Sequence, residues 1–349
     1  FAFNRAGLSR IDSHTLPGPV LSFPLPPRGG RSPCAARHTV LDAAIAAGFW
    51  LPHSCRNGTC GSCHLPVIEG HVRHDPPASY APALPEGQCR SCQAHPDSDL
   101  VLHAPGVPRE AGRRIVTTGA KVLEVRRTSR DVAVVRLRVP PQSGFGFTPG
   151  QYVDVLLKDG SRRSYSMANA PDPDGHIEWH VRRMHGGRFS GHVYDQLKPG
   201  AMLRIEGPFG AFGLRPGDAP VVLLASGTGY APIAALLQAH GSELARRHAV
   251  LYWGARAHED LYALDDPDAW QARHPGVRLV PVLSEPDPAW RGRSGFVHEV
   301  VLADHPDLSW HEVYACGNPL MVEAARASFT GAAQLPATRF HADAFIARH

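Results

Sequence analysis

The pattern of hydrophobic and polar positions changes in character near residue 215. From residue 115 to about residue 212, short segments such as "VAVVRLRV" and "IEWHVRRM" alternate apolar and polar positions and are broken by glycine and proline. This period of two predicts antiparallel strands that form a sandwich or barrel. From residue 218, continuous apolar runs such as "HAVLYWGAR" and "VRLVPVLSE" alternate with helical stretches. Buried strands separated by helices predict a parallel α/β domain.

The first hundred residues have a third pattern. Residues 39–49 place apolar side chains at helical spacing and close with Gly48, which predicts a short helix just before a cysteine-rich loop. Residues 100–114 pass from a strand-like run into a stretch rich in proline, glycine and arginine, which is typical of a linker. We therefore predict three domains, which span residues 18–105, 114–214 and 218–349.

Composition and charge limit the class of protein. The 349 residues are 43% hydrophobic and 19% charged, as in a globular protein. No run approaches the roughly 20 apolar residues that cross a bilayer, and residues 1–30 lack the pattern of an export signal, so we expect a cytoplasmic protein with no membrane partner. Basic residues are in excess between residues 104 and 150, but they alternate along a strand-like segment, so we expect no nucleic-acid binding.

Five of the seven cysteines fall between residues 55 and 92, in and after the stretch "SCRNGTCGSCH". They are too clustered for a disulfide framework and indicate metal or redox chemistry. The "CGSCH" portion has the form of covalent haem attachment. Cys60 and Cys63, with Cys89 and Cys92, make the two C-x-x-C pairs of a zinc site. Cys55, Cys60 and Cys63, with one distant cysteine, have the plant-type [2Fe–2S] spacing. The spacing alone leaves the three sites open.

The stretch "GTGYAP", Gly227 to Pro232, lies where a predicted strand meets a predicted helix. Glycines at such a place let backbone N–H groups approach a pyrophosphate at the positive end of the helix, and Pro232 suits the first helical turn. The third glycine of the dinucleotide fingerprint is missing. The motif is therefore equally consistent with an ordinary turn.

Two stretches of the alternating region suggest a flavin site. "RSYS", Arg163 to Ser166, offers a cation, an aromatic face and a hydroxyl, and "GGRFSG", Gly186 to Gly191, offers a glycine turn about twenty residues later. Aromatic packing suits a flavin ring, and backbone amides suit its phosphates. Taken singly, the same residues also fit a solvated strand and a hairpin.

The stretch "YACGNPLM" places Cys316 and Gly317 at the end of a predicted buried strand. Ligands of open α/β sheets bind at such ends. A small buried cysteine is common in protein cores, and by itself the motif favours that interpretation.

The motifs and their order resemble one family. "LPHSCRNGTCGSC", "CQAHPDSDL", "RRSYSMANAP", "GGRFSGHVYDQLKPG", "IEGPFG", "GTGYAPI", "YWGAR", "YACGNPLM" and "FHADAF" occur between residues 39 and 346 in the order found in NAD(P)H-dependent ferredoxin-type reductases with an N-terminal plant-type [2Fe–2S] domain. These proteins supply electrons to Rieske dioxygenases, diiron monooxygenases and a deoxysugar dehydratase. The chain is most similar to CDP-6-deoxy-3,4-glucoseen reductases and terephthalate dioxygenase reductases.

The resemblance implies a β-grasp ferredoxin domain, an antiparallel β-barrel that binds FAD, and a parallel α/β domain that binds NADH or NADPH. It implies that electrons pass from the nicotinamide through the flavin and the cluster to a partner redox protein. We expect that partner to be an oxygenase component. A deoxysugar dehydratase is the alternative partner, and a zinc-stapled binding module is the alternative of another class.

The resemblance also implies the roles of individual residues. The cluster ligands would be Cys55, Cys60, Cys63 and Cys92, with Cys92 preferred over Cys89. The flavin would be held by Arg163, Tyr165, Ser166, Gly187 and Ser190, and the nicotinamide coenzyme by Gly227, Thr228, Gly229, Pro232, Arg256, Cys316 and Gly317. Ser166 would lie near the reactive flavin N5, and Cys316 beside the nicotinamide C4. Phe345 would shield the flavin, unless it is a terminal core anchor.

The choice between NADH and NADPH depends on residues near Arg256. This arginine is suited to a 2′-phosphate, but Glu259 and Asp260 follow closely and would repel one. We therefore expect a preference for NADH.

Overall fold

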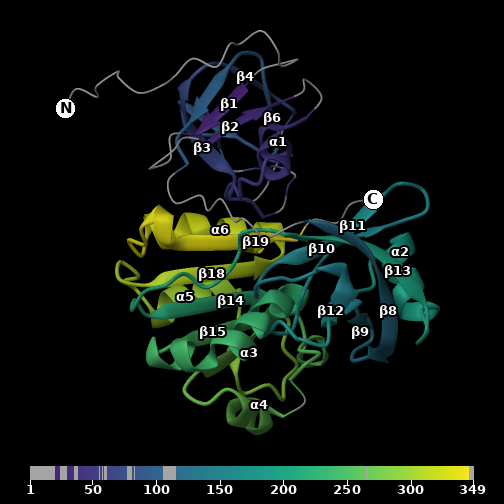
Figure 1. Ribbon diagram of the computed structural model, residues 1–349. Helices are drawn as coiled ribbons and strands as arrows, with labels where there is room; N and C mark the ends of the chain where they lie inside the picture. The colour runs from purple at the N-terminus through teal and green to yellow at the C-terminus, as the bar shows by residue number, and fades with distance from the viewer. Residues whose placement is uncertain are drawn as a thin grey trace. The chain divides into compact units, whose positions relative to one another are not determined.

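The computed structural model describes residues 20–23, 30–34, 38–54, 56, 58, 61–76, 81, 83–104, 115–264 and 266–345 (Figure 1). The described residues fall into two compact units. The first takes its residues from 1–51, 63–77 and 84–110. The second takes its residues from 52–62, 78–83 and 111–349. The segment 52–62 is therefore part of the second unit, although its neighbours in the chain belong to the first.

The first unit is built on a five-stranded sheet in the order β2-β1-β7-β3-β5. Its strands are β1 (Val20–Phe23), β2 (Gly30–Pro33), β3 (His64–Glu69), β5 (Gln88–Arg90) and β7 (Leu100–Leu102). β1 and β7 are parallel and the other pairs are antiparallel. A separate ribbon joins β4 (Val72–His74) to β6 (Ala94–Pro96). One mixed sheet with a short helix is the β-grasp architecture expected for a ferredoxin domain.

The helix of this unit, α1 (Val40–Ala46), lies where the apolar spacing predicts it. Thr39 caps it, since the Thr39 hydroxyl accepts a hydrogen bond from the Asp42 amide at 3.1 Å. Val40, Leu41 and Ala44 are buried and form a core with residues of β3, β5 and β7. The helix therefore ends close to the cysteine-rich stretch.

The second unit begins with a six-stranded antiparallel sheet in the order β11-β10-β13-β8-β9-β12. The strands are β8 (Val116–Arg127), β9 (Val132–Arg138), β10 (Tyr152–Leu156), β11 (Arg162–Ser166), β12 (His176–Arg182) and β13 (Met202–Phe209). The outer strands β11 and β12 also contact each other, so the sheet curls into the expected barrel. Arg136 and Arg138 are exposed while Val135 and Leu137 are buried, as the alternation predicts. The short helices η1 (Pro141–Ser143) and α2 (Arg188–Asp195) complete this part.

The rest of the second unit is a parallel sheet in the order β17-β16-β15-β14-β18-β19 (Figure 1). Its strands are β14 (Val221–Ser226), β15 (Val250–Ala255), β16 (Arg278–Leu283), β17 (Arg293–Ser294), β18 (Glu312–Gly317) and β19 (Phe340–Ala344). Its helices are η2 (Gly227–Gly229), α3 (Tyr230–Arg246), η3 (His258–Asp260), α4 (Pro267–Arg273), α5 (Val297–Asp304), α6 (Pro319–Gly331) and η4 (Ala337–Arg339). This is the parallel α/β domain that the continuous apolar runs predict.

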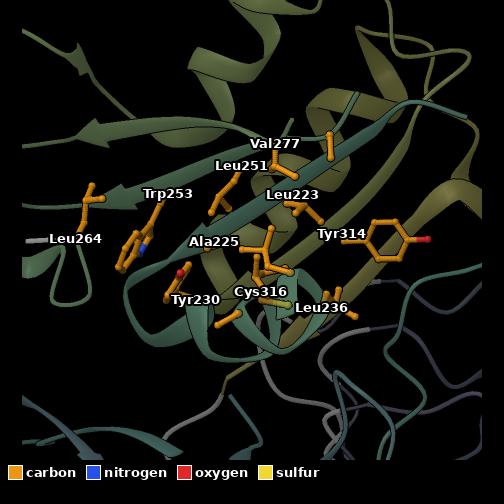
Figure 2. Packing of buried hydrophobic residues seen from close by; sticks show 14 of the residues in the cluster. Leu223, Ala225, Tyr230, Leu236, Leu251, Trp253, Leu264, Val277, Tyr314 and Cys316 are labelled. Carbon is orange, nitrogen blue, oxygen red and sulfur yellow. The ribbon is translucent and has the colours of Figure 1, made fainter. Parts of the chain in front are cut away.

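Successive residues of the central strand β14 serve the two faces of this sheet. Leu223 packs in a cluster with Tyr230, Trp253 and Cys316 on the α3 side (Figure 2). Leu224 packs in a second cluster, with residues of α5 and α6. A strand buried on both faces has no polar alternation, which explains its uniformly apolar sequence. Among the described residues, no helix is long and apolar enough to cross a membrane.

Candidate active site

A cavity of about 1490 Å³ lies in the second unit, with one wall from the barrel and one from the parallel sheet. Single-ligand pockets usually measure roughly 300–1,000 Å³, so this cavity has room for two ligands. Of the cofactor residues expected from the sequence, the lining includes Arg163, Tyr165, Ser166, Gly187, Ser190, Gly227, Thr228, Arg256, Gly317 and Phe345. The residues assigned to a flavin and those assigned to a nicotinamide thus meet in one space.

The barrel wall presents side chains from β11. Tyr165 is stacked on Trp179, with ring centroids 5.5 Å apart, and also contacts Phe189 at 5.7 Å. Burial raises the pKa of the Tyr165 hydroxyl, so this side chain is a neutral aromatic surface at physiological pH. Arg163 and Ser166 lie on either side of it in the strand. A rigid aromatic face with a cation and a hydroxyl nearby matches the needs of a flavin ring and its polar substituents.

The turn before α2 closes this wall. The Ser190 hydroxyl accepts a hydrogen bond from the Met184 amide at 3.0 Å and donates one to the Gly187 carbonyl at 3.2 Å. Both hydrogen bonds of the Ser190 hydroxyl therefore stabilise the turn. A Cβ atom at Gly187 would lie 2.4 Å from the Ser190 oxygen, so the turn needs glycine. The first amides of α2 have no partner within the helix and favour an anion, which fits a pyrophosphate.

The wall from the parallel sheet is mainly backbone. Gly227–Gly229 form the turn η2 between β14 and α3. The indole Nε1 of Trp253 donates a hydrogen bond to the Gly227 carbonyl at 3.1 Å, and the Trp253 ring stacks on Tyr230 with centroids 4.1 Å apart. Core aromatic residues, visible in Figure 2, therefore hold the glycine turn in place.

The turn after β14 touches the turn after β18. A Cβ atom at Gly229 would lie 2.2 Å from the Cys316 carbonyl oxygen, so the two chains meet at their backbones. The Ser226 hydroxyl accepts a hydrogen bond from the Asn318 amide at 2.8 Å, and the Asn318 side chain caps α6 by accepting from the Leu320 amide. The carboxyl ends of two parallel strands thus form one edge of the cavity, the usual place for ligands of such sheets.

Three predicted coenzyme residues do not line the cavity. Gly229, Pro232 and Cys316 are buried beneath its wall. The Cys316 side chain is fully buried in the α3-side cluster (Figure 2). Burial, followed by the charge of Asp343, raises the pKa of its thiol well above the ordinary value. Cys316 is therefore a neutral thiol under the strand end, and its role beside the nicotinamide stays a prediction.

The cavity extends past β15 to a group of charged residues. Arg256 forms an ion pair with Asp260, with Nε 3.3 Å from the carboxylate. Asp260 is buried and also lies 3.6 Å from Arg130, which pairs with Glu259 at 3.2 Å. The charge of Arg256 is thus engaged by the Asp260 carboxylate.

Phe345 follows β19 directly and lines the cavity. Its amide donates a hydrogen bond to the Gly317 carbonyl at 2.8 Å, which joins the residue after β19 to the end of β18. Phe345 is the last residue that the structure describes. Its position on the lining is compatible with shielding a flavin, and that role stays a prediction.

Several lining residues have no counterpart in the sequence predictions. Arg182 of β12 lies against Gly227 and pairs with Asp131 at 3.4 Å. His180 bonds to the Tyr262 hydroxyl at 2.8 Å and to Glu178 at 3.1 Å. The sequence "IEWHVRR" predicts a strand with charged side chains, but only the tertiary fold shows that His180 and Arg182 line the cavity. Ser54 and Asp343 are two more such residues and are treated below.

The structure describes two of the four cysteines expected to bind the cluster. Cys55 and Cys60 lie outside the described residues. Cys63 and Cys92, both in the first unit, have their sulfurs 3.3 Å apart. Two thiolates on one tetrahedral metal with metal–sulfur bonds of ~2.3 Å lie within about 4 Å of each other, so this pair fits a shared metal.

Cys89 differs from Cys92. It is fully buried within β5, where burial and then the neighbouring Cys63 raise the pKa of its thiol to about 12. Metal ligation requires the thiolate. Cys89 lies inside a strand, whereas Cys92 follows that strand and has its sulfur 3.3 Å from that of Cys63, and this geometry favours Cys92 as the ligand.

Comparisons with known proteins agree with this geometry. Residues 27–97 match the family model of the 2Fe-2S iron-sulfur cluster binding domain. Residues 119–213 match the oxidoreductase FAD-binding domain, and residues 223–327 match the oxidoreductase NAD-binding domain. The three matched segments follow one another in the order of the three sheets.

Curated relatives and solved structures span nearly the whole chain. The CDP-6-deoxy-L-threo-D-glycero-4-hexulose-3-dehydrase reductase of Yersinia pseudotuberculosis is 38% identical over 88% of this chain and 93% of its own length. The reductase component 2 of terephthalate 1,2-dioxygenase from a Comamonas species is 37% identical over 90% and 94%. The crystal structure of the Amycolatopsis cytochrome P450 reductase GcoB has a TM-score of 0.74 at 34% identity, with 94% of this chain and 98% of that one covered.

Sequence, fold and cavity lead to the same assignment. The enzyme is an oxidoreductase that uses a nicotinamide coenzyme, FAD and a [2Fe–2S] cluster. The match of residues 27–97 to a 2Fe-2S domain favours an iron–sulfur cluster over haem or zinc at the cysteine-rich stretch. The chain belongs to the family of ferredoxin-type reductases that join a 2Fe-2S iron–sulfur domain to FAD-binding and NAD-binding oxidoreductase domains.

Proposed function

We propose that this enzyme passes electrons from a nicotinamide coenzyme to a separate oxygenase component. The observation that carries the proposal is a cavity lined both by the barrel and by the strand ends of the parallel sheet. When bound, the flavin accepts a hydride, which carries two electrons, and returns them one at a time to a cluster that takes one. A chain with all three domains needs a protein acceptor for those single electrons.

The side chains on the cavity wall bind and orient the two cofactors. Arg163 would supply positive charge, Tyr165 a flat surface and Ser166 a hydroxyl to a bound flavin. The turns at Gly187 and Gly227 supply amides for the two pyrophosphates. Phe345 would cover a flavin bound in the cavity when no coenzyme is present. With both cofactors bound, the walls would limit the access of water to the reacting atoms.

For the cluster we propose the ligands Cys55, Cys60, Cys63 and Cys92. The 3.3 Å contact between the sulfurs of Cys63 and Cys92 supports the last two. The Cys92→Ser variant should lose the cluster absorption while the matched Cys89→Ser variant keeps it. The opposite result would replace Cys92 by Cys89 in this set.

The acceptor is the open part of the function. Curated relatives include reductase components of terephthalate 1,2-dioxygenase and of a xylene/toluene monooxygenase, which favours an oxygenase. A deoxysugar dehydrase is the second candidate, because relatives named as reductases of such a dehydrase are 38% identical to this chain. Reconstitution of NADH-driven turnover with a purified oxygenase and, separately, with a dehydrase will decide between them.

We also propose NADH as the preferred coenzyme. The ion pair between Arg256 and Asp260, at 3.3 Å, supports this, since the carboxylate would repel a 2′-phosphate. Domain limits at residues 18–105, 114–214 and 218–349 are kept as proposals. A cytoplasmic location is proposed because clustered thiols and a nicotinamide donor belong to a reducing compartment, and cell fractionation tests it.

The experiment that tests the function is an anaerobic visible spectrum of the purified protein before and after addition of NADH. We expect overlapping flavin and cluster bands that bleach on reduction. A protein without colour, or one whose bands do not respond to NADH, would contradict the proposal.

A further inference from the structure

The segment Pro52–Ser62, which carries two of the cysteines, is fixed to the reductase part of the second unit. His53 is buried, and its Nε2 accepts a hydrogen bond from the Gly210 amide at 3.0 Å. Its carbonyl accepts a second bond from the Ala211 amide at 2.7 Å. Gly210 and Ala211 directly follow β13. The segment is therefore hydrogen-bonded to the turn that follows β13 of the barrel.

The next residue reaches the cavity. The Ser54 hydroxyl donates a hydrogen bond to the Asp343 carboxylate at 2.5 Å, and both side chains are buried to within a few per cent of full burial. Both residues also line the cavity, beside Ser166 and Phe345. A hydrogen bond between two buried polar side chains is stronger than the same bond in water, because the surrounding dielectric is low.

Further contacts hold the rest of the segment. The Arg56 guanidinium lies 4.4 Å from the centre of the Phe209 ring and 3.8 Å from the Asp154 carboxylate. The Ser62 hydroxyl donates to the Ala342 carbonyl at 3.2 Å, one residue before Asp343. The segment is thus anchored on both sides of Cys55 and Cys60, to β19 at one end and to the barrel at the other.

We propose that the Ser54–Asp343 hydrogen bond positions the cysteine segment on the cavity wall, so that a cluster held in part by Cys55, the next residue in the chain, would receive electrons efficiently from a flavin bound in the cavity. This inference rests on the proposed function. Electron transfer slows steeply as the gap between donor and acceptor widens, and Ser54 is both a wall residue and the chain neighbour of a cluster ligand. Ser54 is therefore a positioning residue for electron transfer from the flavin to the cluster and not for hydride transfer from the coenzyme to the flavin.

The test separates the two steps in the holoenzyme. After anaerobic mixing with NADH, rapid spectroscopy follows flavin bleaching and cluster bleaching separately. In Ser54→Ala we expect cluster reduction to slow about tenfold, because the segment loses an anchor worth about 1.4 kcal/mol and leaves its position on the wall more often, with flavin reduction unchanged. Ser54→Thr keeps the hydroxyl and should restore the rate. Ser328→Ala, which removes a hydroxyl bonded within α6, is the matched control.

A second readout needs no coenzyme. Hydrogen exchange at the Ala211 amide, whose acceptor is the His53 carbonyl, should speed up in Ser54→Ala because the segment loses its neighbouring anchor. Asp343→Ala removes the acceptor from outside the cysteine segment and should reproduce both effects, even if Ser54→Ala assembles its cluster poorly. Cluster reduction at the wild-type rate in both variants would overturn the inference. A wild-type flavin that NADH does not bleach would instead overturn the proposed function.

Discussion

The two walls of the cavity are built in different ways. The barrel wall meets the cavity with side chains, because β11 runs along it and presents Arg163 and Tyr165 from a strand face. The parallel-sheet wall meets it with backbone, because the strands end there and turn at Gly227–Gly229 and Gly317. A side-chain wall can change its chemistry by single substitutions. A backbone wall cannot, since its shape depends on chains that touch.

The largest effect is expected where the backbone wall is tightest. In Gly229→Ala the new Cβ would lie 2.2 Å from the Cys316 carbonyl oxygen and 2.7 Å from the Gly317 Cα, so the two turns must separate. We expect the free energy of unfolding to fall by about 3 kcal/mol, together with loss of NADH oxidation.

Urea denaturation measures the first effect and coenzyme oxidation the second. Gly241→Ala is the control, because it lies in the helix that follows the same turn and its Cβ would meet nothing within 4 Å. Equal stability of the two variants would show that the backbone wall is not as tight as described.

A substitution on the side-chain wall should remove a ligand contact without loss of the fold. We expect Arg163→Ala to raise the dissociation constant of FAD about thirtyfold, the worth of a lost charge-assisted hydrogen bond of about 2 kcal/mol. Titration of the apoprotein with FAD measures it. Arg162→Ala removes an exposed arginine from the neighbouring position, which pairs with Glu206 and does not line the cavity, and should bind FAD normally.

Cys316 tests whether a residue under the backbone wall takes part in chemistry. We expect Cys316→Ala to slow hydride transfer about tenfold through altered placement of the nicotinamide, with the flavin spectrum unchanged. Rapid-reaction measurement of flavin bleaching by NADH decides this. Cys34→Ala, at a buried cysteine of the first unit, is the control. An unaltered rate would make Cys316 a core residue only.

The smallest effect concerns coenzyme choice, where a side chain modifies the backbone wall. Asp260→Asn removes the carboxylate that pairs with Arg256. We expect the ratio of kcat/KM for NADPH to that for NADH to rise about fivefold, in line with the worth of one partly exposed charge pair of about 1 kcal/mol. Steady-state kinetics with both coenzymes measures the ratio, with Asp268→Asn, an exposed acid on α4, as the control. No change in the ratio would remove Asp260 from the proposal.

Local patterns explain why much of the fold could be predicted. The helix at α1, the alternating strand β9 and the junction of η2 with α3 depend on residues that are neighbours in the chain. The stretch "GGRF" was ambiguous between a hairpin and a ligand turn. The structure shows a turn that begins α2, a distinction set by the bond between Ser190 and the Met184 amide.

The remaining features depend on contacts between distant parts of the chain. Ser54 and Asp343 are 289 residues apart, and neither stands in a pattern that indicates the other. The side-chain direction of Cys316 could not be predicted either, because β18 is buried on both faces and its sequence lacks polar alternation. Arg182 and His180 resemble ordinary strand residues until the parallel sheet is placed against the barrel.

The hydrogen bond from Trp253 to the Gly227 carbonyl matters for the interpretation of natural variants. Trp253 is fully buried and would be classed as a core residue by any measure of exposure. Replacement by phenylalanine keeps an aromatic ring on Tyr230 but removes the donor to the glycine turn. Such a variant would therefore fold and yet show a raised KM for the coenzyme, so that a defect in recognition would arise from a side chain that does not itself line the cavity.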